Sequence, residues 1–231
     1  EREGDAVNLI EMIDRNARKF AEKEGIRFEG AGITYAEIRT RSGRAAACLQ
    51  NWSIGKGDRV AIMSRNTPAF VFAFFGAMKA GAVAVPINHK LTAAETAYIL
   101  KNSDAKAFLF EGDLGISVSS LNADIPMAAL DSPAGDSQIP RFEDLMGAAG
   151  SPTPVAVNDD DPAEILYTSG TTGKPKGCVL SHRSVVMAGI TGALILKLDE
   201  TDRMLMAMPI WHSSPLNNWF MGTCYVGGAT V

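Results

Sequence analysis

The spacing of apolar residues along the chain predicts helices and strands in alternation. Residues 8–21 carry apolar side chains three or four positions apart, which predicts an amphipathic helix. Residues 70–80 are apolar on nearly every side, which predicts a buried helix. Short continuous apolar runs predict buried strands at residues 59–64, 82–87 and 106–110.

Two helix starts carry a capping box, in which a threonine precedes a glutamate by three positions. The threonine oxygen and the glutamate carboxylate each satisfy a backbone donor that the first turn leaves free. Thr34–Glu37 therefore predicts a helix that runs to about Leu49, and Thr92–Glu95 predicts one that runs to about Asn102.

The buried helix over residues 70–80 has boundary signals of its own. Asn66 predicts an N-terminal cap, and Pro68 has the backbone angle of a first helical turn. Gly81 predicts the left-handed residue that ends the helix.

Strands that are separated by single helices need crossover connections, so they predict a parallel sheet flanked by helices. The fold class is therefore α/β. Between residues 112 and 161 the pattern weakens, because prolines and small polar residues interrupt it. This stretch predicts partly irregular surface structure that ends in the acidic linker 158–161, which reads NDDD.

Charge and cysteine content exclude several classes of protein. The net charge is only -4, and acidic and basic residues are mixed along the chain. The sequence therefore has no basic cluster of the kind that binds nucleic acid. Three cysteines without a CxxC pair indicate neither a disulfide framework nor a zinc site, and a reducing cytoplasm fits them. Cys178 and Cys224 are interpreted as small buried hydrophobic residues. The apolar run at 69–85 is interrupted and shorter than the roughly 20 residues of a membrane span, and no secretory signal precedes it.

Residues 164–167, which read EILY, predict a short buried strand. The strand leads directly into residues 167–177, which read YTSGTTGKPKG. Glycines let backbone amides approach an anion, hydroxyls donate further hydrogen bonds, and lysines supply positive charge for phosphate oxygens. The loop is not a Walker loop, because Pro175 follows Gly173 and Lys174, and it lacks the GxGxxG order. Ordinary turns also gather Gly, Ser and Thr, but the ordered run ending in KPKG favours a triphosphate cradle.

YTSGTTGKPKG closely resembles the signature loop of the adenylate-forming superfamily of acyl-CoA synthetases, adenylation domains and luciferases. Residues 57–62, 77–88 and 208–212 resemble other segments of this family, in the family's order. The resemblance covers nearly the whole chain. It implies that residues 1–231 are a truncated N-terminal domain, without the C-terminal part of that domain and without the mobile C-terminal domain.

The resemblance implies a two-step reaction that uses ATP, Mg²⁺ and coenzyme A. A carboxylate attacks the α-phosphorus of ATP to give an acyl-adenylate and pyrophosphate, and a thiol then takes the acyl group. The full-length protein is thus expected to be an AMP-forming acyl-CoA synthetase of fatty acid metabolism that acts on a small-molecule carboxylic acid. It is expected in the cytoplasm, and homo-oligomerisation is left open. The fragment alone is expected to be inactive. An amino-acid or aryl-acid adenylation domain, a phosphotransferase and a non-catalytic nucleotide-binding fragment are the alternatives.

The resemblance assigns the nucleotide contacts to the loop. Thr168 would also neighbour the magnesium ion, and Lys176 is expected to matter most. Lys174 is interpreted as a solvated surface charge, and no catalytic residue is assigned within the 231 residues. The residues assigned to the nucleotide are Thr168, Ser169, Gly170, Thr171, Thr172, Gly173 and Lys176.

Five further positions receive an interpretation. His212 resembles a histidine that lines the acyl pocket of acyl-CoA ligases, and Trp211 is assigned to core packing. His89 is assigned to a surface turn. Ser181 predicts a helix cap with His182 partnered nearby, and a direct catalytic role for this pair is the alternative.

Overall fold

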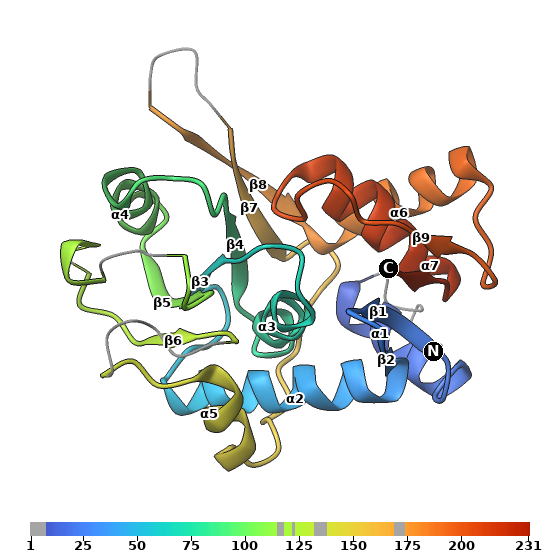
Figure 1. The fold of residues 1–231 in the computed structure, drawn as a ribbon, viewed down its shortest axis with the longest axis horizontal. Coiled ribbons are helices and arrows are strands. Elements are labelled where there is room, and N and C mark those ends of the chain that lie inside the picture. The colour runs from blue at the N-terminus through green and yellow to red at the C-terminus, as the bar shows by residue number, and fades with distance from the viewer. Residues whose placement is uncertain (1–7, 115–117, 122, 132–137, 169–173) are drawn as a thin grey trace.

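The computed structural model describes residues 8–114, 118–121, 123–131, 138–168 and 174–231, which form two sheets with helices between and around them (Figure 1). The larger sheet has six strands in the order β6-β5-β3-β4-β7-β8, and every neighbouring pair is parallel except β7 and β8. The predicted parallel sheet flanked by helices is thereby confirmed. Its strands are β3 (Arg59–Met63), β4 (Val83–Ile87), β5 (Ala105–Phe110), β6 (Met127–Ala129), β7 (Pro162–Thr168) and β8 (Lys176–Ser181).

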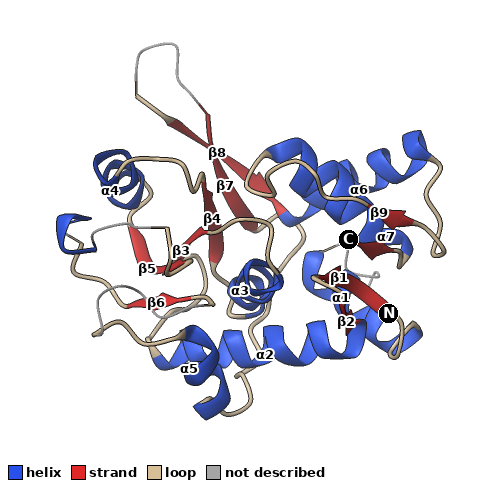
Figure 2. Cartoon of the chain, viewed as in Figure 1, coloured by secondary structure: helices blue, strands red, loops and turns tan. Residues whose placement is uncertain are grey.

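Helices cover both faces of this sheet (Figure 2). Alternate residues of each strand point to opposite sides, so Val60 and Ile62 join one core while Ala61 and Met63 join the other. The first core contains α1 (Leu9–Lys19), α2 (Tyr35–Asn51), α3 (Pro68–Lys79) and α6 (His182–Leu196), and the second contains α4 (Ala93–Asn102).

The predicted helix signals are confirmed with one exception. Both capping boxes are present, and Gly81 adopts the left-handed backbone, with φ of +77°. Thr67, not Asn66, caps α3 by accepting a hydrogen bond from the Phe70 backbone N–H. The Asn66 amide instead donates to the carbonyls of Met206 and Met208 and accepts from the Ile210 N–H. Asn66 thus attaches a segment about 140 positions away to the start of α3.

Helix α3 packs directly on α2. A Cβ atom at Gly76 would lie 2.5 Å from the Cβ of Ala45, so this contact requires glycine. The close approach explains why an almost wholly apolar helix can be buried without a gap at this crossing.

The second sheet has four strands in the order β2-β1-β10-β9, and the apolar pattern did not predict it. Its hairpin of β1 (Glu24–Phe28) and β2 (Ala31–Thr34) pairs in parallel with β10 (Ala229–Thr230), which pairs with β9 (Arg203–Met204). Tyr35 joins this sheet to α2, because its hydroxyl donates to the Gly228 carbonyl at 2.6 Å. The two ends of the described chain therefore share one sheet.

The weakly patterned stretch 112–161 holds only short elements in its described part. These are the 3₁₀ helix η1 (Val118–Leu121), β6 and α5 (Phe142–Ala148). The expectation of partly irregular structure is confirmed. No described helix is both long and apolar enough to span a membrane.

Cys178 corrects a second expectation. Cys224 is buried as expected, but Cys178 is exposed, because β8 is the last strand of its sheet. The apolar context of a residue in the sequence does not distinguish an edge strand from a central one.

A carboxyl group is wholly buried on β7. Glu164 has no exposed surface, and its Oε1 accepts a 2.7 Å hydrogen bond from the Asn217 side chain of the π-helix η2 (Ser214–Phe220). Its Oε2 has no hydrogen-bond partner among the described residues. Burial raises the pKa of Glu164 to about 7, so the folded chain favours the protonated acid.

Replacing Glu164 with glutamine should remove a pH dependence of stability. Since the pKa of Glu164 is raised on folding, its contribution is fully present below the unfolded value of 4.5 and is lost as pH rises to about 7. Above about pH 7 we expect Glu164→Gln to raise the free energy of unfolding by on the order of 1–3 kcal/mol. Urea unfolding at a series of pH values measures this.

The matched control is Glu22→Gln, which changes an exposed carboxylate. We expect Glu22→Gln to keep the decline of stability between about pH 5 and pH 7. A Glu164→Gln variant with the same decline as the wild type would contradict the buried-acid interpretation.

Candidate functional site

Two of the assigned nucleotide residues stand opposite each other at the end of a hairpin. Thr168 is the last residue of β7 and Lys176 the first of β8, and they are direct partners in the antiparallel register. Side chains of directly opposed residues project from the same face of a hairpin, with Cβ atoms about 5 Å apart. The Thr168 and Lys176 side chains, both exposed, therefore project from the same face of the hairpin.

The other assigned residues of the loop, Ser169, Gly170, Thr171, Thr172 and Gly173, lie outside the described residues. Their assignment stays a prediction. Strands β7 and β8 carry the two ends of this stretch away from the helices, at the top of Figure 1.

Helix α4 holds the loop end of the β7–β8 hairpin through two tyrosines. The Tyr98 hydroxyl donates to the Pro175 carbonyl at 3.2 Å, and the Tyr167 hydroxyl donates to Asn102 Oδ1 at 2.6 Å. Lys174 is exposed as expected, with its Nζ 5.9 Å from the centre of the Tyr98 ring. Both strand ends are thus fixed to one helix.

Glycine at position 177 is required for the hairpin to close. A Cβ atom there would lie 2.7 Å from Cγ2 of Ile165. The final glycine of the KPKG run is therefore explained by strand packing.

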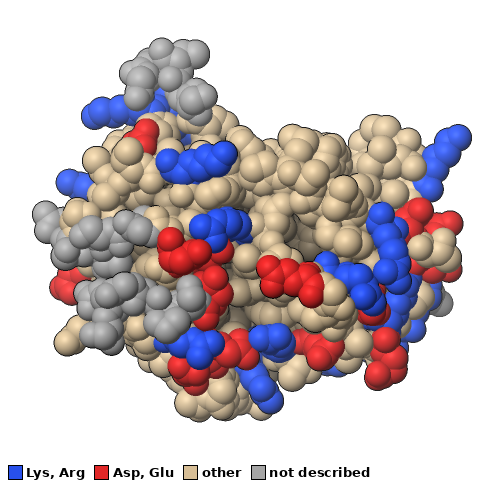
Figure 3. All heavy atoms as spheres, in the orientation of Figure 1, with Lys and Arg blue, Asp and Glu red and all other residues tan. Residues whose placement is uncertain are grey.

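Positive charge gathers where the hairpin leaves the body of the molecule. Lys and Arg side chains lie on the upper part of the face shown in Figure 3, and Lys, Arg and acidic side chains are mixed on its lower part. Lys174 and Lys176 are two exposed contributors. An anion that approaches the hairpin meets this charge first.

His212 lies in a different group of side chains, with Trp211 and His89. The His212 side chain is exposed, and its ring centre lies 3.8 Å from the Trp211 ring at an interplanar angle of 38°. The Trp211 indole N–H donates to Nδ1 of His89 at 3.1 Å. His89 lies in a turn, as expected, but its side chain is only partly exposed. The assignment of Trp211 to the core was wrong, because its side chain is partly exposed, belongs to neither core cluster and contacts His89.

Ser181 and His182 have the structural roles that their positions predict. The Ser181 hydroxyl caps α6 by accepting from the Ser184 N–H at 3.3 Å. His182 is buried, and its Nδ1 accepts from the Leu9 N–H at 3.4 Å. Burial lowers the pKa of His182 to about 4, against the opposite effect of the nearby aspartates, so the ring is neutral.

Acidic side chains converge at one place beyond the strand ends. Carboxylate oxygens of Glu111, Asp113 and Asp131 lie within 4.8 Å of one another. The Arg65 guanidinium already occupies this cluster, with its Nη1 2.8 Å from Glu111 and 3.1 Å from Asp113. The group is an ion-pair network.

Thr168 offers a single neutral oxygen to a metal ion. Magnesium takes about six oxygen ligands in near-octahedral geometry and is usually held together with substrate phosphates. Thr168 therefore fits as one ligand of a metal ion that phosphates already hold.

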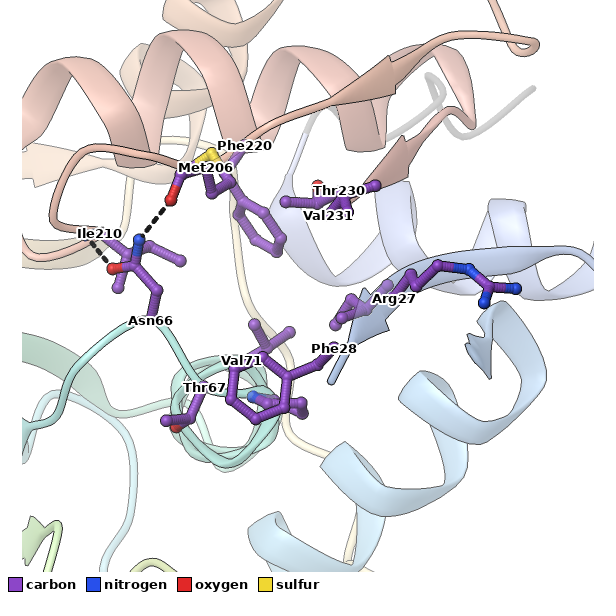
Figure 4. A pocket seen from close by; sticks show the side chains of 12 residues that line it. Arg27, Phe28, Asn66, Thr67, Val71, Met206, Ile210, Phe220, Thr230 and Val231 are labelled. Atoms are coloured by element: carbon purple, nitrogen blue, oxygen red, sulfur yellow. Dashed lines mark hydrogen bonds between the residues drawn. The ribbon is translucent and has the colours of Figure 1, made fainter. Parts of the chain in front are cut away.

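A cavity of about 170 Å³ separates the small sheet from α3 (Figure 4). Asn66 lies at its wall, with both of its amide atoms engaged by the segment that carries Met206 and Ile210. His212 is not among the described residues that line it. The lining is mainly apolar and includes Ile26, Phe28, Val71, Met206, Ile210 and Phe220.

Comparisons with known proteins agree with this arrangement. A family described as "AMP-binding enzyme" matches residues 13–231. A long-chain-fatty-acid–CoA ligase of Mycobacterium tuberculosis is 38% identical over 186 residues, covering 80% of this chain and 36% of that protein. A crotonobetaine/carnitine–CoA ligase of Salmonella heidelberg is 34% identical over 219 residues, covering 89% of this chain and 42% of that protein.

A solved structure has the same fold. The benzoate CoA ligase of Burkholderia xenovorans superposes with a TM-score of 0.85 and 27% identity, over 96% of this chain and 44% of that one. This chain spans less than half of the length of each of these three relatives. Since the family match covers all but the first residues, the chain belongs to the AMP-binding enzymes, the adenylate-forming superfamily, and corresponds to their N-terminal portion.

Proposed function

We propose that the protein activates a carboxylic acid with ATP and transfers the acyl group to coenzyme A. The observation that carries this proposal is the pairing of Thr168 with Lys176 at the end of the β7–β8 hairpin. A hydroxyl donor and a lysine that project from the same face of a hairpin are suited to the oxygens of a nucleotide's phosphates.

The first step brings two anions together, a carboxylate and a triphosphate. Lys176 supplies positive charge toward the phosphates, and the Thr168 hydroxyl donates a hydrogen bond to them. Tyr98 and Tyr167 fix both strand ends to α4, so the backbone that carries Thr168 and Lys176 is held in place before the nucleotide binds. Magnesium brought with ATP would neutralise further phosphate charge, with Thr168 as one oxygen ligand.

The acid is the least determined part of the proposal. The relatives are named for a fatty acid, for crotonobetaine or carnitine, and for benzoate. Coenzyme A ligation is favoured over amino-acid activation because His212 stands where an amino-acid activator would offer an acidic partner for the substrate amine. An aryl acid is the second candidate for the substrate, which the benzoate CoA ligase favours.

The complete reaction is proposed for a protein of the relatives' length. The 231 residues match 36% and 42% of two of these relatives, so we propose that further chain completes the site. Cys48, Cys178 and Cys224 are free thiols, which fits the proposed location in a reducing cytoplasm.

The 231-residue chain alone should not exchange labelled pyrophosphate into ATP in the presence of an acid. The expectation follows from a site that holds the phosphate-binding hairpin without the rest of the domain. A longer protein that includes the chain is the control, and it should exchange pyrophosphate and release AMP. Acid-dependent exchange by the short chain would contradict the expectation, and release of ADP would favour a phosphotransferase.

In the longer protein, Lys176→Ala should slow acid-dependent pyrophosphate exchange on the order of 100-fold, because one fixed cation is lost from the phosphates. The matched control is Lys174→Ala, which removes a neighbouring exposed lysine and should change the rate much less. Thermal unfolding checks that both variants keep the fold. An exchange rate that Lys176→Ala leaves unchanged would remove this residue from the mechanism.

A further inference from the structure

His89 lies at the same edge of the large sheet as the phosphate-binding hairpin. Strands β4 and β7 are parallel neighbours, with Ala84 opposite Glu164. His89 is five residues beyond Ala84, and Thr168 is four beyond Glu164. The carboxyl ends of parallel strands share one edge, where open α/β sheets bind their ligands. His89, just after β4, and the phosphate loop, just after β7, therefore lie at the same edge of the sheet.

The side chain of His89 fixes a second aromatic residue. Its Nδ1 accepts from the Trp211 indole N–H at 3.1 Å, and the two rings meet edge to face, with centres 6.2 Å apart at 78°. A histidine that accepts at Nδ1 carries its proton at Nε2 in the neutral ring. The indole has one donor and no acceptor, so this bond sets the orientation of the ring.

Trp211 in turn packs against His212, with ring centres 3.8 Å apart. The backbone on either side is also tied, because the His212 N–H donates to the Pro209 carbonyl and the Leu216 N–H donates to the His212 carbonyl. Asn66 holds the preceding residues through Met206, Met208 and Ile210. The Trp211 ring is placed by its contacts with the rings of His89 and His212.

We propose that His89 is a positioning residue, which holds the Trp211 ring against His212 and so shapes the acid-binding side of the sheet edge. The proposal rests on the proposed function for its catalytic consequence, while the contact itself does not depend on it. His89 acts through Trp211 and does not itself touch the substrate.

The contact exists only while His89 is neutral, since a doubly protonated ring has no acceptor. Burial lowers the pKa of His89 below its ordinary value. The charged groups that act on it are Arg65 and Lys90, which lower the pKa further, and Glu111, which raises it. The hydrogen bond is therefore present at neutral pH and lost as pH falls through this lowered pKa.

The contact can be tested in the 231-residue chain by the indole N–H resonances of its three tryptophans. Trp211→Phe assigns the Trp211 signal, and Trp52 and Trp219 serve as internal controls. We expect the Trp211 signal alone to shift in His89→Phe, and to shift in the wild type on acidification. His89→Gln, whose amide oxygen can accept, should restore the neutral signal. A Trp211 signal that is the same in His89→Phe and the wild type overturns the proposal.

The catalytic consequence is tested in the longer protein. His89→Phe should raise the KM for the acid about fivefold, the factor expected for one lost hydrogen bond, and leave the KM for ATP within twofold. His89→Gln should recover most of the acid KM. An unchanged acid KM, or an equal rise for ATP, overturns the positioning role. If the longer protein activates no acid, the proposed function fails, and the indole signals still decide whether His89 holds Trp211.

Discussion

The parallel pairing of β3, β4, β5 and β7 brings several candidate functional residues to one edge of the large sheet. Hydrogen bonds along these strands set their carboxyl ends at one edge, and each strand continues there into a segment with polar or charged side chains. Arg65 follows β3, His89 follows β4, Glu111 follows β5, and the phosphate-binding loop follows β7. Groups that are far apart in the sequence become neighbours because of strand register.

The same pairing also buries a carboxyl group in the core beneath this edge. Glu164 is the residue of β7 that pairs with Ala84 of β4, and its side chain enters the apolar layer under α6 and η2. A buried acid that makes one hydrogen bond costs stability unless it is protonated. A buried polar contact between β7 and η2 can fix how the helices lie over the sheet, where apolar contacts alone would allow them to slide.

Local signals in the sequence predicted the elements that local interactions determine. Capping boxes at Thr34 and Thr92 are satisfied within one helical turn, and the loop after β7 is identified by a continuous run of residues. The π-helix η2 and the short strands β9 and β10 carry no such signal. Strands of two residues are too short to show a periodic pattern. They form because β1 pairs with β10 and β10 in turn pairs with β9.

Contacts between distant segments explain the errors at single residues. Asn66 is a good N-cap residue by type, but its amide finds three partners in a segment that lies far away in the sequence, and Thr67 takes the cap. His89 and Trp211 are separated by 122 positions. The residues around either of them in the sequence therefore do not show that the two side chains form a hydrogen bond. In the candidate site, the strand that leads into the candidate nucleotide loop could be predicted from the sequence, and the contact between His89 and Trp211 could not.

The position of β8 at the sheet edge has a practical consequence for studies in solution. Cys178 is exposed there, while Cys48 and Cys224 are buried. Burial raises the pKa of Cys48 to about 11 and that of Cys224 to about 12, which suppresses their reactive thiolates. A maleimide dye should therefore attach to the native chain at Cys178 first, which places a label on the hairpin itself without any engineered cysteine.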